Sequence, residues 1–565
     1  MALRFGTRTA LATLGLVSLS LACGDDTSVV VSTSEDEPGT SSESEDSADS
    51  DEGETSGGED ETSTETGEPP PPPELGGPAA GISIIAVEAN QGTGVSVSVG
   101  EDWIEPDARN AYLVHGRDTM VRFQHTILDP EAWIPRDLSA FLHIYPPNGG
   151  EELIRERTFF VSGDSDPRDL STNFFFSVVA EEAVPGTRFW IELRESDAAI
   201  DVSGLSEGVT SSPAEPELFG FEETDLELEV MLIPVDYQWP DPPRYPDITE
   251  EDLTLFHDYL LQQNPVQEVK FEIRSEPLVR NQRVTNLGSL LEPTRNLKVQ
   301  DGAAPNVYYH SLIDVGGPSV NMVAGIANLA GPGMGEGFWR VAATVYYKHV
   351  DPGDEEEGEE PQVFSPAASA RTFVHEVGHN QGLSHVYCPG GNSAGDDPNY
   401  PHMDGHIGVF GFGIRDFHIY SPQHAHDYMS YCGNAWVSDW TWNKTFVRIA
   451  ELTSWNQGNA PAPDPGASGA VLVGTLFADG SEQWWVHEIP VQVQPSGAQR
   501  LELWRDGQLL GHSYAQVELL SDGQTVQLRA PLPSAQLELD AIVRVDALGE
   551  RHPIAPAQIQ FAHAP

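Results

Sequence analysis

Hydrophobic and polar positions alternate in short runs through the first part of the chain. The runs are ISIIAVEA, GVSVSV, AYLVHG, TMVRFQHTIL, AFLHIYPP, RTFFVSG, NFFFSVVA and RFWIEL. Alternation with a period of two places neighbouring side chains on opposite faces of a strand, and many short strands separated by turns are typical of a β-sandwich. The pattern predicts a β-sandwich domain over residues 79–225, ending in the acidic, turn-rich stretch 213–225.

The pattern changes at residues 226–237, LELEVMLIPVDY, a nearly continuous apolar run that is typical of a buried strand. A helix should follow, because Thr249 is a good N-cap, acids fill the first turn, and three apolar residues share one face: Leu253, Phe256 and Leu260. VKFEIR at 269–274 returns to a strand pattern. These elements predict an α/β (α+β) domain over residues 226–455.

Two later segments complete this predicted domain. VAATVYYKHV at 341–350 should be its edge strand, against which an extended peptide could pair through main-chain hydrogen bonds. TWNKTFVRIAELTSW at 441–455 should be its closing helix.

Strand-like runs return after a Pro- and Gly-rich linker at residues 456–469. They are VLVGTLF, WWVHEIPVQV, RLELWRDGQLL, TVQLRA and AIVRVDA, and they predict a second β-sandwich at 470–565. The predicted fold is therefore multidomain, with the α/β (α+β) domain between two β-sandwich domains.

The first residues have the pattern of an export signal. Arg4 and Arg8 precede an apolar run of thirteen residues, which is too short to span a bilayer and predicts a signal peptide at 1–22. Ala22-Cys23-Gly24 resembles a bacterial lipobox, which implies lipidation of Cys23 and a place in the cell envelope, at the outer membrane or cell surface. The alternative is simple signal cleavage nearby.

Residues 23–78 are rich in Ser, Thr, Glu, Asp and Gly and end in a proline run, so they cannot bury enough apolar surface to fold. This composition predicts an extended, disordered tether. The formal net charge of −59 argues against binding to nucleic acid. The lipid anchor is then the only expected contact with a membrane.

Candidate chemistry is concentrated in HEVGHNQGLSH. His375 and His379 are four residues apart, so in a helix both rings leave the same face and can meet one zinc ion. Glu376 could reach water at the metal as a general base. Gly382 should end the helix, and the chain would then return His385 as a third ligand. Three protein ligands are the catalytic rather than the structural arrangement of zinc.

This stretch resembles the extended zinc motif of the metzincin metallopeptidases and is also similar to the secreted bacterial StcE-like group. Metzincins carry a methionine turn beneath the metal, and HDYMSYC offers Met429 at that position. Tyr431 matches the place where astacins and serralysins have a tyrosine near the zinc. The resemblance implies that Tyr431 is a fifth ligand or a donor to the oxyanion; core packing is the alternative.

The same resemblance brings two cysteines together. Cys388 comes three residues after His385, and Cys432 comes three residues after Met429, so both would converge on one zinc site. Export places them where disulfides persist. A Cys388–Cys432 disulfide is therefore expected, with two buried free thiols as the alternative.

DPGDEEEGEE at 351–360 places seven acids just before the zinc motif. A solvated loop is one interpretation. Calcium binding through carboxylate oxygens is another, and repulsion of acidic substrates is a third.

The function expected from these features is that of a zinc-dependent endopeptidase acting on proteins or glycoproteins. The alternative is a surface adhesin, in which two β-sandwiches bind a ligand around an idle core. A zinc hydrolase with a substrate other than protein is a third hypothesis. The intact Glu376 favours an enzyme, because metal binding alone would not need it.

Overall fold

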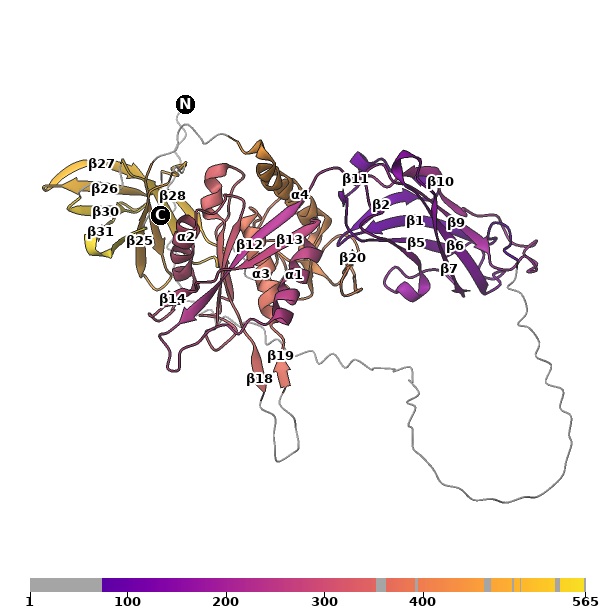
Figure 1. Ribbon diagram of the computed structural model, residues 1–565, viewed down its shortest axis with the longest axis horizontal. Coiled ribbons are helices and arrows are strands. Elements are labelled where there is room, and N and C mark those ends of the chain that lie inside the picture. Colours follow the sequence, from indigo (N-terminus) through magenta and orange to yellow (C-terminus); the bar gives the residue numbers. More distant parts are fainter. Residues whose placement is uncertain are drawn as a thin grey trace, which may run out of the picture. The chain divides into compact units, whose positions relative to one another are not determined.

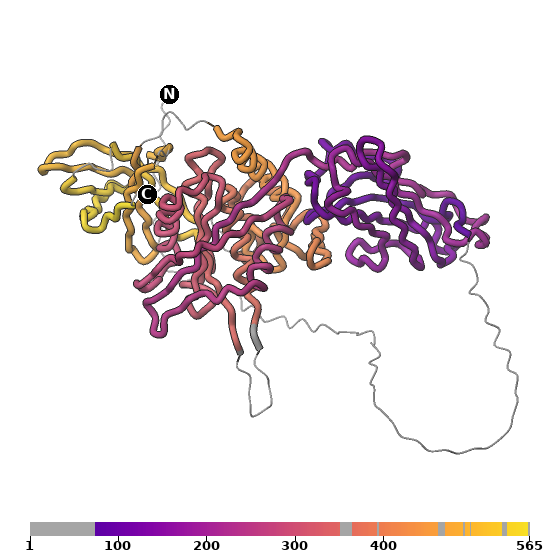
Figure 2. The backbone as a smooth tube through the Cα atoms, viewed as in Figure 1, coloured from indigo at the N-terminus to yellow at the C-terminus, as the bar shows by residue number. Residues whose placement is uncertain are grey.

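Strands greatly outnumber helices in this protein. The computed structural model describes residues 74–351, 362–391, 395–461, 469–489, 492–497, 499–533 and 539–562, and within them several sheets are combined with four α-helices. Figure 2 follows the chain from the N-terminal strands in indigo to the C-terminal strands in yellow. The predicted multidomain mixture of α and β structure is confirmed at this level.

Several predicted features lie outside the described residues. They are the signal peptide at 1–22, Cys23 with most of the tether at 23–78, most of the acidic loop at 351–360, and the middle of the linker at 456–469.

Two antiparallel sheets form from the first alternating runs (Figure 1). One has the order β3-β2-β1-β5-β8 and the other β10-β9-β6-β7. Side chains from both sheets, such as Val87 and Leu142, belong to one buried cluster. The strands are β1 (Ile82–Asn90), β2 (Gly94–Val99), β3 (Asp102–Trp103), β5 (Thr119–Ile127), β6 (Arg136–Tyr145), β7 (Leu153–Val161), β8 (Phe174–Val178), β9 (Arg188–Glu195) and β10 (Ser211–Leu218).

Strand β10 was missed by the sequence pattern. Its sequence SSPAEPEL reads as turn-rich, but it pairs with β9 at the edge of the four-stranded sheet. Prolines are tolerated on an edge strand, because one side of its backbone has no partner in the sheet. Two further short strands, β4 (Leu113–Val114) and β11 (Phe221–Glu222), pair in parallel.

The central sheet is mostly parallel and has the order β13-β12-β15-β17-β16, with β14 also beside β12. Its strands are β12 (Glu227–Tyr237), β13 (Glu268–Ile273), β14 (Leu278–Arg280), β15 (Tyr308–Ile313), β16 (Gly325–Ala327) and β17 (Val341–Val345). Strand β16 runs antiparallel to β17 and forms one edge.

The prediction of an edge strand at residues 341–350 was therefore wrong. Strand β17 lies between β15 and β16, and all five of its residues are buried, as a central strand covered on both faces requires. The segment then leaves the sheet, and its last residues belong to a separate hairpin of β18 (His349–Asp351) and β19 (Gln362–Phe364).

The helices are α1 (Glu250–Gln263), α2 (Leu291–Gln300), α3 (Ala367–Asn380) and α4 (Asp439–Ser454). Helix α1 begins as predicted: the Thr249 hydroxyl accepts the Asp252 N–H, and the Asp252 carboxylate accepts the Thr249 N–H. Helix α3 packs against α1, β16 and β17, so the edge strand lies beside the helix with the zinc motif.

The last part of the described chain again forms two sheets, in the orders β28-β29-β24-β25-β32 and β27-β26-β30-β31. Their strands are β24 (Val471–Leu476), β25 (Glu482–His487), β26 (Arg500–Arg505), β27 (Gln508–Tyr514), β28 (Gln516–Leu519), β29 (Val526–Pro531), β30 (Ala541–Val545), β31 (Arg551–Ile554) and β32 (Ile559–Phe561). Their inner side chains, such as Leu472 and Leu503, form a cluster of their own.

A buried polar network joins these strands to the central domain. The Glu292 carboxylate on α2 pairs with Arg295 and lies 2.8 Å from Nε2 of His487 on β25. It also accepts a hydrogen bond of 3.1 Å from Gln527 on β29. Each charge in the network has a partner, as burial of charge requires.

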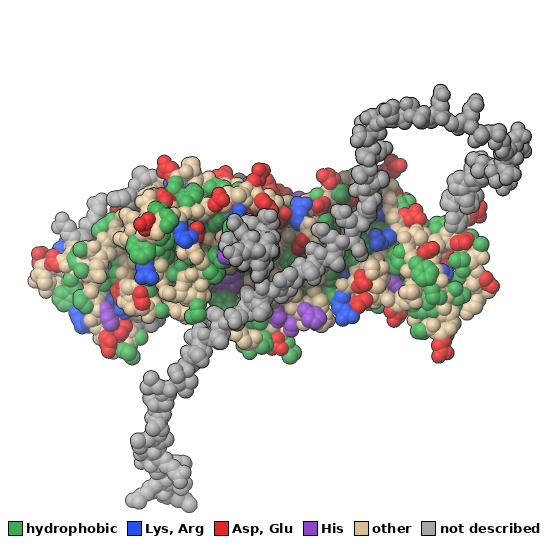
Figure 3. Space-filling model, turned by 90° about the horizontal axis from the view of Figure 1, so that it is seen from below, with side chains coloured by type: hydrophobic (Ala, Val, Ile, Leu, Met, Phe, Trp, Pro, Cys, Tyr) green, Lys and Arg blue, Asp and Glu red, His purple; other side chains and the backbone are tan. Residues whose placement is uncertain are grey.

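No helix in the described part of the chain is long and apolar enough to span a membrane. On the face seen in Figure 3, basic side chains lie singly among acidic ones rather than in one patch.

Candidate metal centre

Helix α3 carries the first two predicted ligands, His375 and His379. It begins at Ala367, with Pro366 as a non-helical N-cap. The helix ends at Asn380, and Gly382 takes a φ of 88°. Glycine adopts this left-handed conformation without steric cost, which lets the chain turn back after the helix.

Three histidine rings meet where the chain returns. The donor nitrogens of His375, His379 and His385 all lie within 4.8 Å of one another. The Nε2 atoms of His375 and His379 are 3.0 Å apart, and all three residues are buried. The structure thus brings the predicted ligand set together.

Backbone carbonyls orient two of these rings. Nδ1 of His375 donates to the Tyr428 carbonyl at 2.7 Å, and Nδ1 of His379 donates to the Leu383 carbonyl at 2.8 Å. A proton on Nδ1 leaves the Nε2 lone pair for a metal, and such outer hydrogen bonds are usual for metal-binding histidines.

The protonation of the rings also suits a metal. Burial and the neighbouring His385 lower the pKa of His375 to about 3, and burial holds the pKa of His379 well below its usual value. Both rings are therefore neutral at pH 7, the form that binds a metal. A set of three histidine ligands fits a zinc ion that keeps a fourth position for water.

Glu376 lies beside the cluster, almost fully buried. Burial raises the pKa of Glu376 to about 8, although a hydrogen bond from Ser521 opposes the shift. The Ser521 hydroxyl donates to Oε2 of Glu376 at 3.1 Å. Glu376 thus directly follows the first predicted ligand, and its carboxyl group already has a hydrogen-bond partner.

Met429 packs directly against helix α3. An added Cβ at Gly378, in the middle of the zinc motif, would come within 2.4 Å of the Met429 sulfur and 3.0 Å of the Tyr428 ring. Only glycine allows this approach. The Met429 carbonyl accepts the Val386 N–H at 3.0 Å, so the methionine turn also contacts the segment that carries His385.

A buried carboxylate holds this turn, and the sequence did not point to it. Asp427 accepts the Met429 N–H at 2.8 Å through one oxygen and the Ser438 hydroxyl at 2.5 Å through the other. Burial raises the pKa of Asp427, and these hydrogen bonds oppose the shift. The same Ser438 hydroxyl caps helix α4 through Thr441, so the carboxylate connects the methionine turn to that helix.

The expected disulfide is present between Cys388 and Cys432, with their Cα atoms 6.1 Å apart. It joins the segment that follows His385 to the segment that follows Met429. Two buried free thiols, the alternative, are excluded.

Tyr431 lies at the mouth of the site. Its ring centre is 4.8 Å from that of His385 and 5.6 Å from that of His375. Its hydroxyl donates to the Ser521 carbonyl at 2.9 Å. Desolvation and the nearby Glu376 raise the pKa of Tyr431, so the hydroxyl is a donor at neutral pH.

No protein-family model matches this chain, and no curated protein is similar to it.

Ser521 is the site residue that sequence reasoning missed entirely. It lies between strands β28 and β29, 145 residues after Glu376, within a run that carries no catalytic motif. No local signal in the sequence could have found it.

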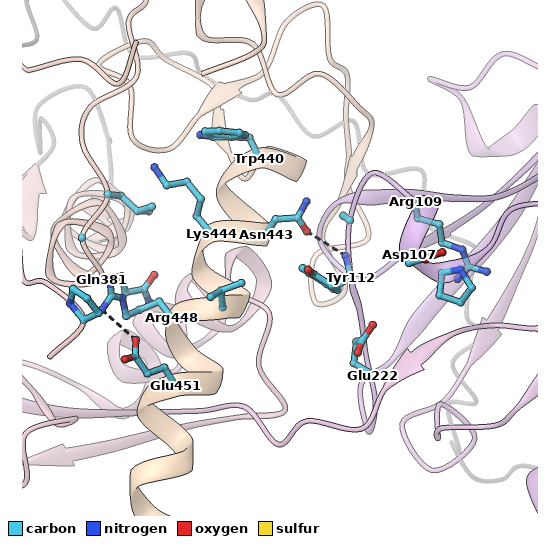
Figure 4. A pocket seen from close by; sticks show the side chains of 16 residues that line it. Asp107, Arg109, Tyr112, Glu222, Gln381, Trp440, Asn443, Lys444, Arg448 and Glu451 are labelled. Atoms are coloured by element: carbon cyan, nitrogen blue, oxygen red, sulfur yellow. Dashed lines mark hydrogen bonds and ion pairs between the residues drawn. The ribbon is translucent and has the colours of Figure 1, made fainter. Parts of the chain in front are cut away.

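A separate cavity of about 680 Å³ lies beside helix α4. Its lining includes Arg109 and Tyr112 from the N-terminal region and Lys444, Arg448 and Glu451 from α4 (Figure 4). Arg448 pairs with Glu451 at 3.5 Å. None of the three histidines lines this cavity, so it is distinct from the candidate metal centre.

Proposed function

We propose that this chain is an exported, lipid-anchored zinc endopeptidase that hydrolyses peptide bonds in proteins or glycoproteins. The observation that carries the proposal is the convergence of His375, His379 and His385 beside Glu376, with Met429 packed beneath the same helix. In this proposal the central domain is a metzincin-like catalytic domain, and the sheet pairs on either side of it are β-sandwiches.

His375, His379 and His385 would hold the zinc ion. When bound, zinc acts as a Lewis acid that polarises the scissile carbonyl and lowers the pKa of water. Glu376 accepts the proton of the attacking water and passes it to the leaving amine. The Tyr431 hydroxyl donates to the oxygen that becomes negative.

The edge strand β16 supplies the binding surface. Its outer side faces away from β17, where main-chain groups could pair with an extended peptide. Helix α3 packs against β16, and a peptide in this position would lie next to Glu376.

Export and anchoring are part of the proposal and rest first on the sequence of residues 1–23. The oxidised Cys388–Cys432 pair supports a non-reducing compartment.

One observation favours an adhesin with an idle core as the second candidate. The Ser521 hydroxyl donates a hydrogen bond to the carboxylate of Glu376, which would act as the base. An idle site could keep such a contact without loss.

Substitution of Glu376 tests the proposal. Purified full-length protein should bind one zinc ion and cleave denatured protein, and a chelator should stop cleavage. Glu376→Ala should keep the zinc, measured by elemental analysis, but lose at least about 100-fold in kcat/KM, the lower range for loss of a general base.

Glu276→Ala is the matched control, because this glutamate is 84% exposed and its one ion pair among the described residues is with Arg274 at 3.9 Å. It should behave as wild type. Equal cleavage by wild type and Glu376→Ala would refute the enzyme and favour the adhesin.

A further inference from the structure

The turn at residues 520–525, between β28 and β29, reaches from the C-terminal sheets to the candidate metal centre. It is closed by the Leu520 N–H on the Thr525 carbonyl at 2.9 Å. The Asp522 carboxylate accepts the N–H groups of Gln524 and Thr525 at 3.0 and 2.8 Å. Leu520 is buried in a cluster with residues of the central sheet, including Ile326. The 520–525 turn is thus a defined structure held on the central domain.

Ser521 makes three contacts in the site. Its hydroxyl donates to Glu376 at 3.1 Å and accepts the Ala327 N–H at 2.8 Å. Its carbonyl accepts the Tyr431 hydroxyl at 2.9 Å. These partners are the general base, the edge strand and the oxyanion donor of the proposed reaction.

The neighbouring strands extend this contact along the edge. The Leu329 N–H donates to the Glu518 carboxylate of β28 at 3.0 Å. The Asn328 side chain donates to Gln527 of β29 at 3.0 Å. The β28–β29 hairpin therefore uses the main-chain N–H groups of Ala327 and Leu329, which an extended peptide along this edge would need.

A peptide and the 520–525 turn cannot occupy these groups at once. A scissile carbonyl would need the Tyr431 hydroxyl, and the attacking water would need the free carboxylate of Glu376. Ser521 bonds to both groups, because its carbonyl accepts from the Tyr431 hydroxyl and its own hydroxyl donates to Glu376. The contact is a main-chain carbonyl on Tyr431 and a hydroxyl on Glu376, the same pair of functional groups that a peptide and a water molecule would present.

We propose that the 520–525 turn is a built-in competitive inhibitor, which keeps the proposed peptidase latent until the turn leaves the site. This inference rests on the proposed function and concerns its regulation. Substrate binding then competes with an intramolecular ligand, so the apparent affinity for substrate is reduced by the fraction of molecules in which the turn is displaced.

Ser521→Ala tests the inference, because it removes two of the three contacts and keeps the turn. Loss of one or two hydrogen bonds should shift the opening equilibrium by about tenfold. We expect kcat/KM on a peptide substrate to rise by about that factor. Ser481→Ala is the matched control, since this serine lies in the β24–β25 turn and its hydroxyl donates to Asp479, away from the candidate metal centre.

Two measurements do not depend on turnover. The affinity of a peptide hydroxamate for zinc-loaded full-length protein should rise about tenfold in Ser521→Ala. Amide hydrogen exchange at Ala327 should become faster in the same variant. Asp522→Ala, which loosens the turn and keeps the Ser521 hydroxyl, should change all three readouts in the same direction.

The outcomes separate the inference from the proposed function. Lower kcat/KM in Ser521→Ala with unchanged hydroxamate affinity would overturn the inference and make Ser521 a positioning residue for Glu376. Unchanged values in both turn variants would overturn it as well, while the loss in Glu376→Ala would still support the enzyme. Protein that binds no zinc would overturn the function itself, and the inference with it.

Discussion

The Tyr431 hydroxyl is the donor to the oxyanion in the proposed reaction. If it donates to the oxyanion, Tyr431→Phe should lower kcat by one to three decades, because the bond is stronger in the transition state than in the bound substrate. KM should change little. Steady-state kinetics of wild type and Tyr431→Phe on the same peptide substrate measures this effect.

Tyr400→Phe is the control for a lost tyrosine hydroxyl. Tyr400 donates to the His406 carbonyl at 2.7 Å and contacts no predicted ligand. Its substitution should affect stability and leave kcat unchanged. The same kcat in Tyr431→Phe and wild type would assign Tyr431 to packing alone.

Residues whose roles depend on local spacing could be predicted, and residues whose roles depend on distant contacts could not. The four-residue spacing of His375 and His379 follows directly from helical geometry. Asp427 acts through Ser438 and Met429, and a lone aspartate before a methionine gives no sign of this.

At the scale of elements, the Cys388–Cys432 disulfide joins two segments that position the ligands. It closes a loop with a sequence separation of 44, worth about 4 kcal/mol in the chain-entropy model. The double variant Cys388→Ser/Cys432→Ser should lower the unfolding temperature and weaken zinc binding. Thermal unfolding and competition with a chelator measure the two effects.

Titration of thiols in the denatured, unreduced protein is the control. Neither Cys388 nor Cys432 should react with a thiol reagent before reduction, and both should react afterwards. Zinc affinity that stays the same after the double substitution would show that the ligand segments do not need the bond.

There are physical reasons why some elements could not be predicted from the sequence. Helix α2 lacks an apolar stripe, because its buried face includes Glu292, Arg295 and Lys298, which are satisfied by other segments. Strand β16 has only three residues, Gly325–Ala327, too few for a period to be seen. Helix α1, with a good cap and an apolar face, was predicted to within a residue.

At the scale of the whole molecule, the pKa of Glu292 predicts how low pH affects the stability of the contact between the central and C-terminal parts. Burial would raise the pKa of Glu292, but Arg295 and His487 outweigh it and lower the pKa to about 2. The carboxylate therefore stabilises the fold fully above its unfolded pKa of about 4.3. This contribution is lost as the pH falls through about 2.

Glu292→Gln should destabilise the protein at pH 7 by about 3–5 kcal/mol, as expected when one partner of a buried ion pair is removed. The difference from wild type should shrink as the pH falls from about 4 toward 2, because the wild-type carboxylate is then protonated as well. Thermal unfolding as a function of pH measures this, with exposed Glu276→Gln as control. A difference that is constant from pH 7 to pH 2 would contradict the assignment.

The strand-rich character and the order of α and β regions were visible in the sequence, but the contact of the 520–525 turn with Glu376 was not. Alternation and caps act over a few residues. A contact across 145 residues depends on how two folded parts meet, and no pattern within either part encodes it.

The disulfide also determines when, after synthesis, the support of the metal centre is complete. A reducing cytoplasm keeps Cys388 and Cys432 as thiols, so the His385 segment and the methionine turn are not yet joined there. Oxidation after export would complete the support of the metal centre. Under the proposed function, the site would therefore become rigid only beyond the cytoplasm, where the cell's own newly made proteins are out of its reach.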